Sequence, residues 1–294
     1  MKVVESLIKK KIYLYLEHSY RDKSKKIKKK RQYLGKNIPL NIEEIKKKFM
    51  DQINKELWYG DLDNIKNEYI KEFSKLPFTA KKKEEENFLI KFTYNTNRIE
   101  GCTITLKETV MLLQERRSPV NKPLKDIKEI ENHEQVFKSM LNEKHDLSLS
   151  LIKGWHKKLL INIDEEIAGK IRAHNVAIAG SKFEPPQPNE IQYLLRRFIQ
   201  WYNDSKEEMH PVELAAIAHL KFVTIHPFTD GNGRTARIIM NFILHKNKFP
   251  MLDISYLRRN SYYNSLERSQ IKGEDRIFVS YIIRRYLKDY KRFI

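Results

Sequence analysis

The residues best suited to chemistry lie together in HPFTDGNGRTAR, at positions 226–237. Apolar runs flank this segment, and its Asp-Gly and Asn-Gly pairs predict a tight loop between two buried helices. A glycine-rich loop that leads into a helix leaves N–H groups unpaired at the positive end of the helix dipole. The segment follows a helix and lacks a Gly-Lys-Ser/Thr ending, so it is not an ordinary P-loop. It still predicts an anion-binding loop.

Each polar residue of the loop can supply one part of a phosphoryl or nucleotidyl transfer site. His226 can act as a general base near neutral pH, and Asp230 offers one oxygen ligand for Mg²⁺, which commonly combines such a carboxylate with substrate phosphates. Arg234 and Arg237 lie three residues apart on one face of a helix's first turn, where arginine needs an anionic partner. Asn232 and the glycine amides can stabilise charge on a phosphoryl oxygen.

This segment resembles the signature of the Fic (Fido) domain family, His-x-Phe-x-Asp/Glu-Gly-Asn-Gly-Arg-x-x-Arg, with every fixed position present. The resemblance covers roughly residues 40–294 in the pattern of elements. It implies a protein adenylyltransferase, which transfers AMP from ATP to a Ser, Thr or Tyr hydroxyl of a protein target. In that reaction His226 would deprotonate the hydroxyl and Asp230 would hold Mg²⁺. The phosphates would be bound by Gly231, Asn232, Gly233, Arg234 and Arg237.

TNRIEG, at residues 96–101, resembles the inhibitory motif Ser/Thr-x-x-x-Glu-Gly/Asn, which lies before the core in one class of the family. Thr96, Glu100 and Gly101 occupy its fixed positions. A carboxylate on a helix could pair with Arg237 and take the place of the γ-phosphate, so the resemblance implies self-inhibition by Glu100. In the alternative interpretation, Glu100 only closes a helix before a C-cap glycine.

Two further segments resemble parts of the family that contact the substrates. Residues 172–184 resemble a β-hairpin flap that registers a target segment by strand addition, with Val176 and Ile178 as the docking edge. Plain packing of these two side chains on the helices is the alternative. YYNSLERSQ resembles the segment that lines the base pocket, in which Tyr263 and Gln270 would contact the nucleotide.

The elements that position these residues are predicted from periodicity, caps and breakers. Strands at 12–20 and 25–34, with a turn at 21–24, predict a basic N-terminal β-hairpin, and a second hairpin is expected within 169–186. The fold class is therefore mainly α: a Fic/Fido helical core with a short β-hairpin flap, plus the N-terminal β-hairpin. Helices are expected from residue 41 and at 61–75, 79–100, 105–116, 123–143, 149–162, 188–203, 211–225, 234–246 and 260–291.

Three regions are predicted along the chain. Residues 1–38 would form the basic N-terminal β-hairpin, 39–118 a helical region that carries the inhibitory motif, and 119–294 the catalytic core. No apolar run reaches the ~18 residues that span a bilayer, and the N-terminus lacks the pattern of a signal peptide. Cys102 is alone, which excludes an internal disulfide framework. A cytoplasmic protein with no membrane partner is expected.

The chain has 57 Lys and Arg against 38 Asp and Glu in 294 residues, a formal net charge of +19. Such a charge indicates contacts with phosphates or else an AT-rich codon composition, which also supplies Ile, Asn and Tyr. Because basic residues are spread along the sequence, composition is the favoured explanation for the whole. The dense block RDKSKKIKKKR, at 21–31, stays a candidate contact with nucleic acid.

Three hypotheses for the function result. The leading one is a self-inhibited protein adenylyltransferase that uses ATP and Mg²⁺ and acts on a protein hydroxyl, with self-modification and homodimer formation as further options. The second is removal of AMP from modified proteins, for which Glu100 would orient the attacking water. The third is a nucleic-acid-binding regulator, supported by the charge and residues 21–31.

Overall fold

The structure, a computed structural model, describes residues 1–21 and 26–294. It divides into two compact units, Met1–Asn64 and Ile65–Phe293, with the boundary inside helix α2 (Gly60–Lys75). The first unit holds α1 from the predicted 39–118 region, and the second holds α3 and α4 together with the helices of the predicted core. Within the described residues, no helix is both long and apolar enough to cross a bilayer.

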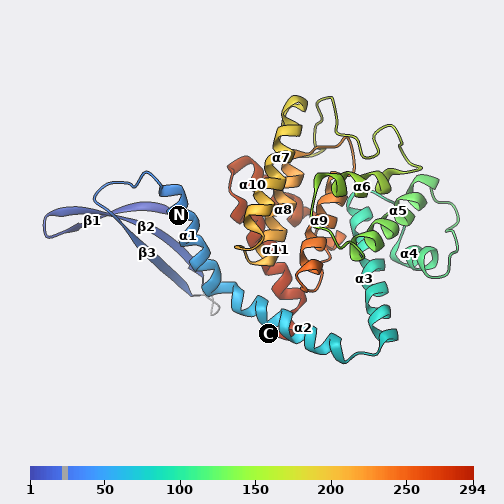
Figure 1. Cartoon of the computed structure of the whole chain (residues 1–294), viewed down its shortest axis with the longest axis horizontal. Helices are drawn as coiled ribbons and strands as arrows, with labels where there is room; N and C mark the ends of the chain where they lie inside the picture. Colours follow the sequence, from blue (N-terminus) through green and yellow to red (C-terminus); the bar gives the residue numbers. More distant parts are fainter. Residues whose placement is uncertain (22–25) are drawn as a thin grey trace. The chain divides into compact units, whose positions relative to one another are not determined.

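The first unit is an antiparallel sheet covered on one face by a helix. Its strands β1 (Lys2–Ile8), β2 (Lys11–Arg21) and β3 (Ile27–Gly35) lie in that order, so β2 is central (Figure 1). Helix α1 (Ile42–Asn54) is followed by one π-helical turn, Lys55–Tyr59. The sheet and α1 share a small hydrophobic core of Leu16, Leu34, Phe49 and Ile53.

The predicted N-terminal hairpin is part of this larger sheet. The pairing of β2 with β3 agrees with the prediction, whereas β1 was not predicted. The reason lies in the β1–β2 turn, where Lys9 and Lys10 have positive φ values of 48° and 63°. Hairpin turns of this kind normally carry Asn-Gly or Asp-Gly, so a pair of lysines hides the turn signal. Most of the turn predicted at 21–24 lies outside the described residues.

The second unit is helical. Its helices begin and end within a few residues of the predicted bounds, with one exception. The predicted helix 260–291 is two helices, because the chain turns at Gly273, which has a left-handed φ of 63°. The helices are α3 (Phe78–Ile99), α4 (Leu106–Leu113), α5 (Leu124–Leu141), α6 (Leu149–Leu160), α7 (Pro188–Ser205), α8 (Pro211–Ile225), α9 (Asn232–Lys246), α10 (Arg259–Lys272) and α11 (Asp275–Asp289), with short 3₁₀ turns at Tyr256–Arg258 and Lys291–Phe293.

Helix α8 forms the centre of this unit. Nearly all of its side chains are buried, as its apolar sequence predicts, because α7, α9 and α11 pack around it. Helix α9 follows it after a short loop and also contacts α3, α5 and α6 (Figure 1). The loop between α8 and α9 is therefore held by two core helices.

The hairpin predicted within 172–184 is not a pair of strands. The segment is an extended loop with a tight turn, in which the Ser181 N–H donates to Ile178 O at 3.0 Å. A hairpin requires the returning arm to donate to the opposite arm. Here the Lys182 N–H donates instead to the Glu267 carboxylate of α10 at 2.6 Å, so the arms form no ladder.

Candidate active site

The loop between α8 and α9 begins at a residue with an unusual backbone. His226 is the C-cap of α8 and has a left-handed conformation, with φ 49° and ψ 56°. Residues with a side chain rarely adopt this conformation, which costs on the order of 1–3 kcal/mol and persists only where the surroundings hold it. His226 is therefore fixed in an orientation that a regular helix end would not give it.

Arg172 holds this backbone in place. Its buried guanidinium donates through Nε to His226 O at 2.8 Å, and its other nitrogens donate to His174 O at 2.8 Å and Pro186 O at 2.6 Å. The Arg172 N–H also donates to Pro227 O at 3.0 Å. One side chain thus ties the start of the α8–α9 loop to both ends of the extended loop. Arg172 was not predicted to belong to the site, because a single arginine in a polar segment carries no sign of burial.

The imidazole of His226 has a defined tautomer. Its Nδ1 lies 3.2 Å from Val223 O, and a carbonyl can only accept a hydrogen bond, so Nδ1 carries the proton. The Nε2 lone pair is then free to accept a proton. Burial lowers the pKa of His226, and the charge of Arg172 lowers it further. The ring is therefore neutral at neutral pH, as a general base must be.

Asn232 closes the loop with its side chain. Its Oδ1 accepts from the Phe228 N–H at 2.9 Å and its Nδ2 donates to Phe228 O at 2.7 Å. Phe228 itself is fully buried. The Asn232 carboxamide is thus engaged with the loop backbone, so the backbone N–H of Asn232 is the group best placed to meet an anion at the helix N-terminus.

His156 of α6 supports the same loop and was also missed. Its ring stacks on Phe228 with a centroid distance of 3.6 Å. Nδ1 accepts from the Gly169 N–H at 2.9 Å, so Nε2 is the donor to Asp230 O, also at 2.9 Å. Burial lowers the pKa of His156 to about 4, which keeps the ring neutral. His156 therefore positions the backbone of the residue that the family resemblance assigns to the metal.

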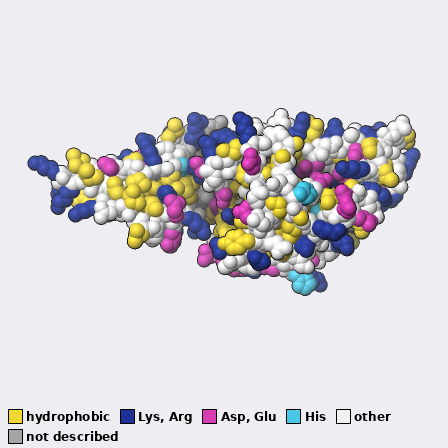
Figure 2. Space-filling view, turned by 90° about the horizontal axis from the view of Figure 1, so that it is seen from above, with side chains coloured by type: hydrophobic (Ala, Val, Ile, Leu, Met, Phe, Trp, Pro, Cys, Tyr) yellow, Lys and Arg dark blue, Asp and Glu magenta, His cyan; other side chains and the backbone are white. Residues whose placement is uncertain are grey.

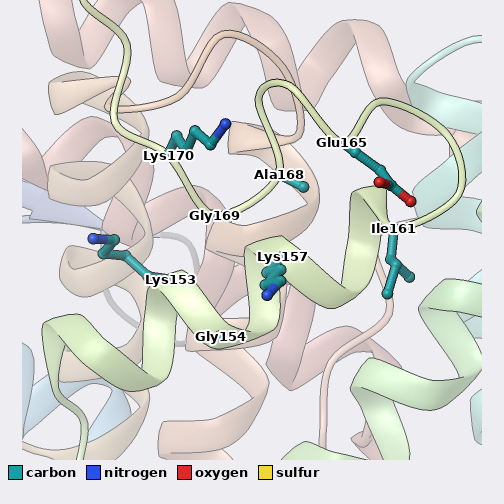
Figure 3. Close-up of a pocket in the computed structure, with 8 residues that line it drawn as sticks. All are labelled: Lys153, Gly154, Lys157, Ile161, Glu165, Ala168, Gly169 and Lys170. Atoms are coloured by element: carbon teal, nitrogen blue, oxygen red, sulfur yellow. The ribbon is translucent and has the colours of Figure 1, made fainter.

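The segment that presents Gly169 to His156 crosses α6 closely. A Cβ at Gly169 would lie 3.0 Å from Cβ of Lys157, so a side chain would push the segment away. Figure 3 shows this crossing and the residues around it. A cavity of about 570 Å³ lies beside the crossing. The cavity is lined by Lys153, Gly154, Lys157, Ile161, Glu165, Ala168, Gly169 and Lys170.

The N-terminus of α9 is open to an anion. Its N-cap is Gly231, which has no side chain to cap the first turn, and the Gly231 N–H itself donates to Asp230 Oδ1 at 2.5 Å. Arg234 is buried in that turn and donates to Glu129 Oε1 at 3.0 Å and to Asp230 Oδ2 at 3.4 Å. Its Nε has no partner among the described residues. The Asp230 side chain is 49% exposed, so its carboxylate can reach a ligand outside the loop.

Arg237 binds two residues of the TNRIEG segment, Thr96 and Glu100. Its Nη2 donates to Glu100 Oε1 at 2.6 Å, and its Nε donates to Thr96 Oγ1 at 2.6 Å. Nη1 donates to the buried Tyr262 hydroxyl at 3.3 Å, and that hydroxyl contacts Nε2 of His219 at 2.9 Å. The predicted contact between Glu100 and Arg237 is thus present in the structure, across 137 residues of sequence.

Glu100 stands at the C-terminal end of α3, where the helix closes in a Schellman motif. Gly101 has φ 101°; its N–H donates to Arg98 O, and the Cys102 N–H donates to Asn97 O. The glycine therefore sets the direction in which Glu100 leaves the helix. A Cβ at Gly233 would clash with Glu100 Oε1, so the carboxylate lies directly against the first turn of α9.

The residues proposed for the base pocket lie on α10. The Tyr263 hydroxyl donates to Ile99 O at 3.1 Å, next to Glu100, and Gln270 Nε2 donates to Thr224 Oγ1 at 3.2 Å. In the extended loop, Val176 and Ile178 are half-buried and alternate with exposed neighbours. The expected alternation is present there, although no strand pairs with it.

The sequence model of the Fic/DOC family matches residues 146–244, which include α6, α8, the loop and nearly all of α9. Residues 146–244 are a Fic domain. A Fic-domain-containing signaling protein of Bacteroides thetaiotaomicron has a similar structure, with a TM-score of 0.71 at 29% identity over 78% of this chain and 95% of its own. The Fic-1 structure from Caenorhabditis elegans gives a TM-score of 0.70 at 28% identity, over 86% of this chain and 76% of its own.

Curated relatives of the Fic domain carry an enzyme's name. Protein adenylyltransferase fic-1 of Caenorhabditis elegans is 34% identical over 209 residues, which are 69% of this chain and 41% of the relative. Protein adenylyltransferase Fic of Drosophila melanogaster is 35% identical over 193 residues, which are 64% of this chain and 39% of the relative. The chain therefore spans about two-fifths of the length of the curated relatives it matches.

Proposed function

We propose that the Fic domain is a protein adenylyltransferase that transfers AMP from ATP to a Ser, Thr or Tyr hydroxyl of a protein target. One observation carries the proposal. The His226 imidazole donates through Nδ1 to Val223 O, so its Nε2 is free to accept a proton, and it stands at the start of the loop that leads into the N-terminus of α9. Base and anion site are thereby combined within one loop. The names of the curated relatives support the same reaction.

In the proposed reaction, Nε2 of His226 takes the proton of the target hydroxyl. The hydroxyl oxygen forms a bond to the α-phosphorus of ATP, and the bond from that phosphorus to the bridging oxygen breaks, so that pyrophosphate leaves. The first-turn N–H groups of α9 would stabilise the charge on the phosphoryl oxygens. Arg234 and Arg237 would bind the β- and γ-phosphates.

Mg²⁺ fits the residues at this site. A half-exposed carboxylate, that of Asp230, stands beside an anion site, and Mg²⁺ is commonly bound by one or two carboxylates together with substrate phosphates. Asp230 would hold the ion, which when bound neutralises phosphate charge. The bond from His156 to Asp230 O would keep this residue in position.

The ion pair of Glu100 with Arg237 supports self-inhibition as part of the proposal. In this conformation Arg237 donates four hydrogen bonds, to Thr96, Tyr262 and Glu100. A γ-phosphate that needs Arg237 would have to displace the Glu100 carboxylate. Val176 and Ile178 would dock the target segment, and Tyr263 and Gln270 would contact the base.

Removal of AMP from a modified protein is the second candidate. It is favoured by the geometry of Glu100, whose Oε1 pairs with Arg237 while the side chain stays 26% exposed. The other carboxylate oxygen could then orient a water molecule for attack on the phosphorus.

Intact-mass analysis after incubation with ATP and Mg²⁺ tests the proposal. Glu100→Gly is expected to gain the mass of one or more AMP groups by self-modification, and adding His226→Ala should lower the rate by about 10²–10⁴-fold. Glu115→Gly, a change at an exposed glutamate after α4, serves as the control and should behave as the unsubstituted chain.

Labelling that survives His226→Ala would overturn the role of the base. Equal labelling with and without Glu100 would overturn self-inhibition, and loss of AMP from a purified modified protein only when Glu100 is present would favour removal.

A further inference from the structure

The N-terminal sheet has a second face that the proposed function does not use. Alternation along the strands turns Leu16 and Leu34 toward α1, so their neighbours point the other way. We call this other side the outer face. It consists of Lys2, Val4 and Ser6 of β1, Tyr13, Tyr15, Glu17 and Ser19 of β2, and Lys29, Arg31 and Tyr33 of β3.

Three tyrosines cluster on the outer face. The ring of Tyr33 lies 6.0 Å from that of Tyr13 and 5.4 Å from that of Tyr15, in both cases tilted by more than 50°. The Tyr33 side chain is 55% exposed, and the other two are half-buried. An exposed aromatic cluster on a sheet offers flat surfaces on which planar groups can stack.

The part of this unit that forms the sheet, residues 1–38, concentrates the positive charge of the chain. Residues 1–38 hold thirteen of the 57 Lys and Arg and three of the 38 Asp and Glu, a surplus of ten out of the net nineteen. A uniform codon bias would spread this surplus evenly along the 294 residues, so composition alone does not account for it. Figure 2 shows basic and hydrophobic side chains side by side on this part of the molecule.

The outer face carries part of this charge next to the rings. Arg31 pairs with Glu17 at 2.6 Å, and Lys2 lies 3.7 Å from the same carboxylate. Glu17 is thereby offset by two cations, and Lys29 stands one outward position further along β3. The face is positive beside an aromatic cluster.

We propose that the outer face binds single-stranded nucleic acid, with bases stacked on Tyr13, Tyr15 and Tyr33 and phosphates bound by the neighbouring Lys and Arg. Stacking on aromatic side chains beside a basic track is how sequence-tolerant single-strand binders work. An acidic peptide would match the charge but not the rings, and a duplex buries its bases away from them. The observations therefore favour a single strand over both.

Fluorescence anisotropy with the full chain tests this inference. The probes are labelled oligo-U and oligo-dT of about 16 nucleotides, the upper end of the usual site size of one such module. A duplex of equal length and a poly-glutamate peptide serve as competitors. Both single strands should bind, with an affinity that falls as salt rises, and neither competitor should displace them at equal concentration. Displacement by the duplex or the peptide, or no binding to either strand, would overturn the inference.

Two pairs of substitutions separate stacking from charge. Tyr33→Ala should weaken binding about tenfold with the salt dependence kept, whereas Tyr33→Phe should bind as the unsubstituted chain. Lys29→Ala should weaken binding and reduce the slope of log K against log salt concentration by about one. Lys272→Ala on α10 should change neither the affinity nor this slope. Equal binding by Tyr33→Ala would overturn the stacking model. His226→Ala should bind normally, so this result and that of the transfer assay are independent.

Discussion

His226 has a left-handed backbone conformation and a defined tautomer, and a hydrogen bond to a backbone carbonyl supports each of them. Val223 O fixes the proton on Nδ1, and the Arg172 guanidinium holds the carbonyl of His226 itself. The imidazole itself donates to an uncharged backbone carbonyl, and the charged Arg172 donates only to the backbone of His226. Burial and hydrogen bonding thus keep the ring neutral, as the proposed general base requires, and among the described residues the Nδ1 partner is a carbonyl where many hydrolases use a carboxylate.

This arrangement predicts the pH dependence of transfer. Burial lowers the pKa of His226 below its ordinary value near 6.5, and only the neutral ring can accept a proton. Activity of the Glu100→Gly form should therefore stay level as the pH falls from 8 through about 6.5 and decline only below that. The measurement is kcat/KM across this range. A decline that begins above the ordinary histidine pKa would contradict the role of burial.

Arg172 is predicted to be a positioning residue. Arg172→Lys cannot reproduce three hydrogen bonds in a planar fork, so His226 O, His174 O and Pro186 O would not all stay bound. In the Glu100→Gly background, we expect kcat to fall about tenfold or more, with a smaller change in KM for ATP. Lys170→Ala, at an exposed neighbouring position, is the control. Kinetics equal to those of the parent would show that Arg172 acts only on stability.

At the scale of elements, the C-terminal end of α3 carries the residue that occupies Arg237, and in the proposed self-inhibition it controls whether Arg237 is available to a phosphate. Glu100 reaches Arg237 because the helix closes at Gly101, which has φ 101°. Most residues with a side chain are strongly disfavoured at such a φ.

Gly101→Ala is therefore expected to disturb the position of Glu100. Labelling by self-modification should rise above that of the unsubstituted chain and stay below that of Glu100→Gly, because the carboxylate is displaced but not removed. Gly273→Ala, at the left-handed C-cap of α10 with φ 63°, is the control for a strained helix end away from Glu100. It should lower stability by about 1 kcal/mol without extra labelling. Extra labelling by the control alone would contradict the role assigned to α3.

The elements also show where the sequence was informative. Helices α8 and α9 and the loop between them could be predicted because apolar periodicity, Pro227 and the glycine pairs are local signals. Arg172 and His156 could not, because they act on residues 54 and 74 positions away and only the packed fold brings them to the loop. The flap prediction failed for a related reason: alternation of Val176 and Ile178 indicates an extended chain, but strand pairing depends on where Lys182 donates.

At the scale of the whole molecule, the proposed chemistry and the proposed nucleic-acid surface belong to different compact units. Every residue assigned to the transfer site lies within Ile65–Phe293, and the outer face lies within Met1–Asn64. Each unit has buried hydrophobic residues of its own, including Leu16 and Phe49 in the first and Phe222 and Phe242 in the second. Such a division predicts that a cavity made in the core of one unit lowers the stability of mainly that unit.

Phe49→Ala tests this division. Phe49 lies on α1 and is fully buried against the sheet, so its truncation should destabilise the first unit by about 3–5 kcal/mol. Hydrogen exchange followed by mass spectrometry should then show faster exchange in β1, β2, β3 and α1, with α8 and α9 unchanged. Phe242→Ala, in the core around α9, is the matched control and should give the reverse pattern. Binding to single strands should weaken in Phe49→Ala while labelling of its Glu100→Gly form persists, and faster exchange in α8 and α9 would show instead that the two units unfold together.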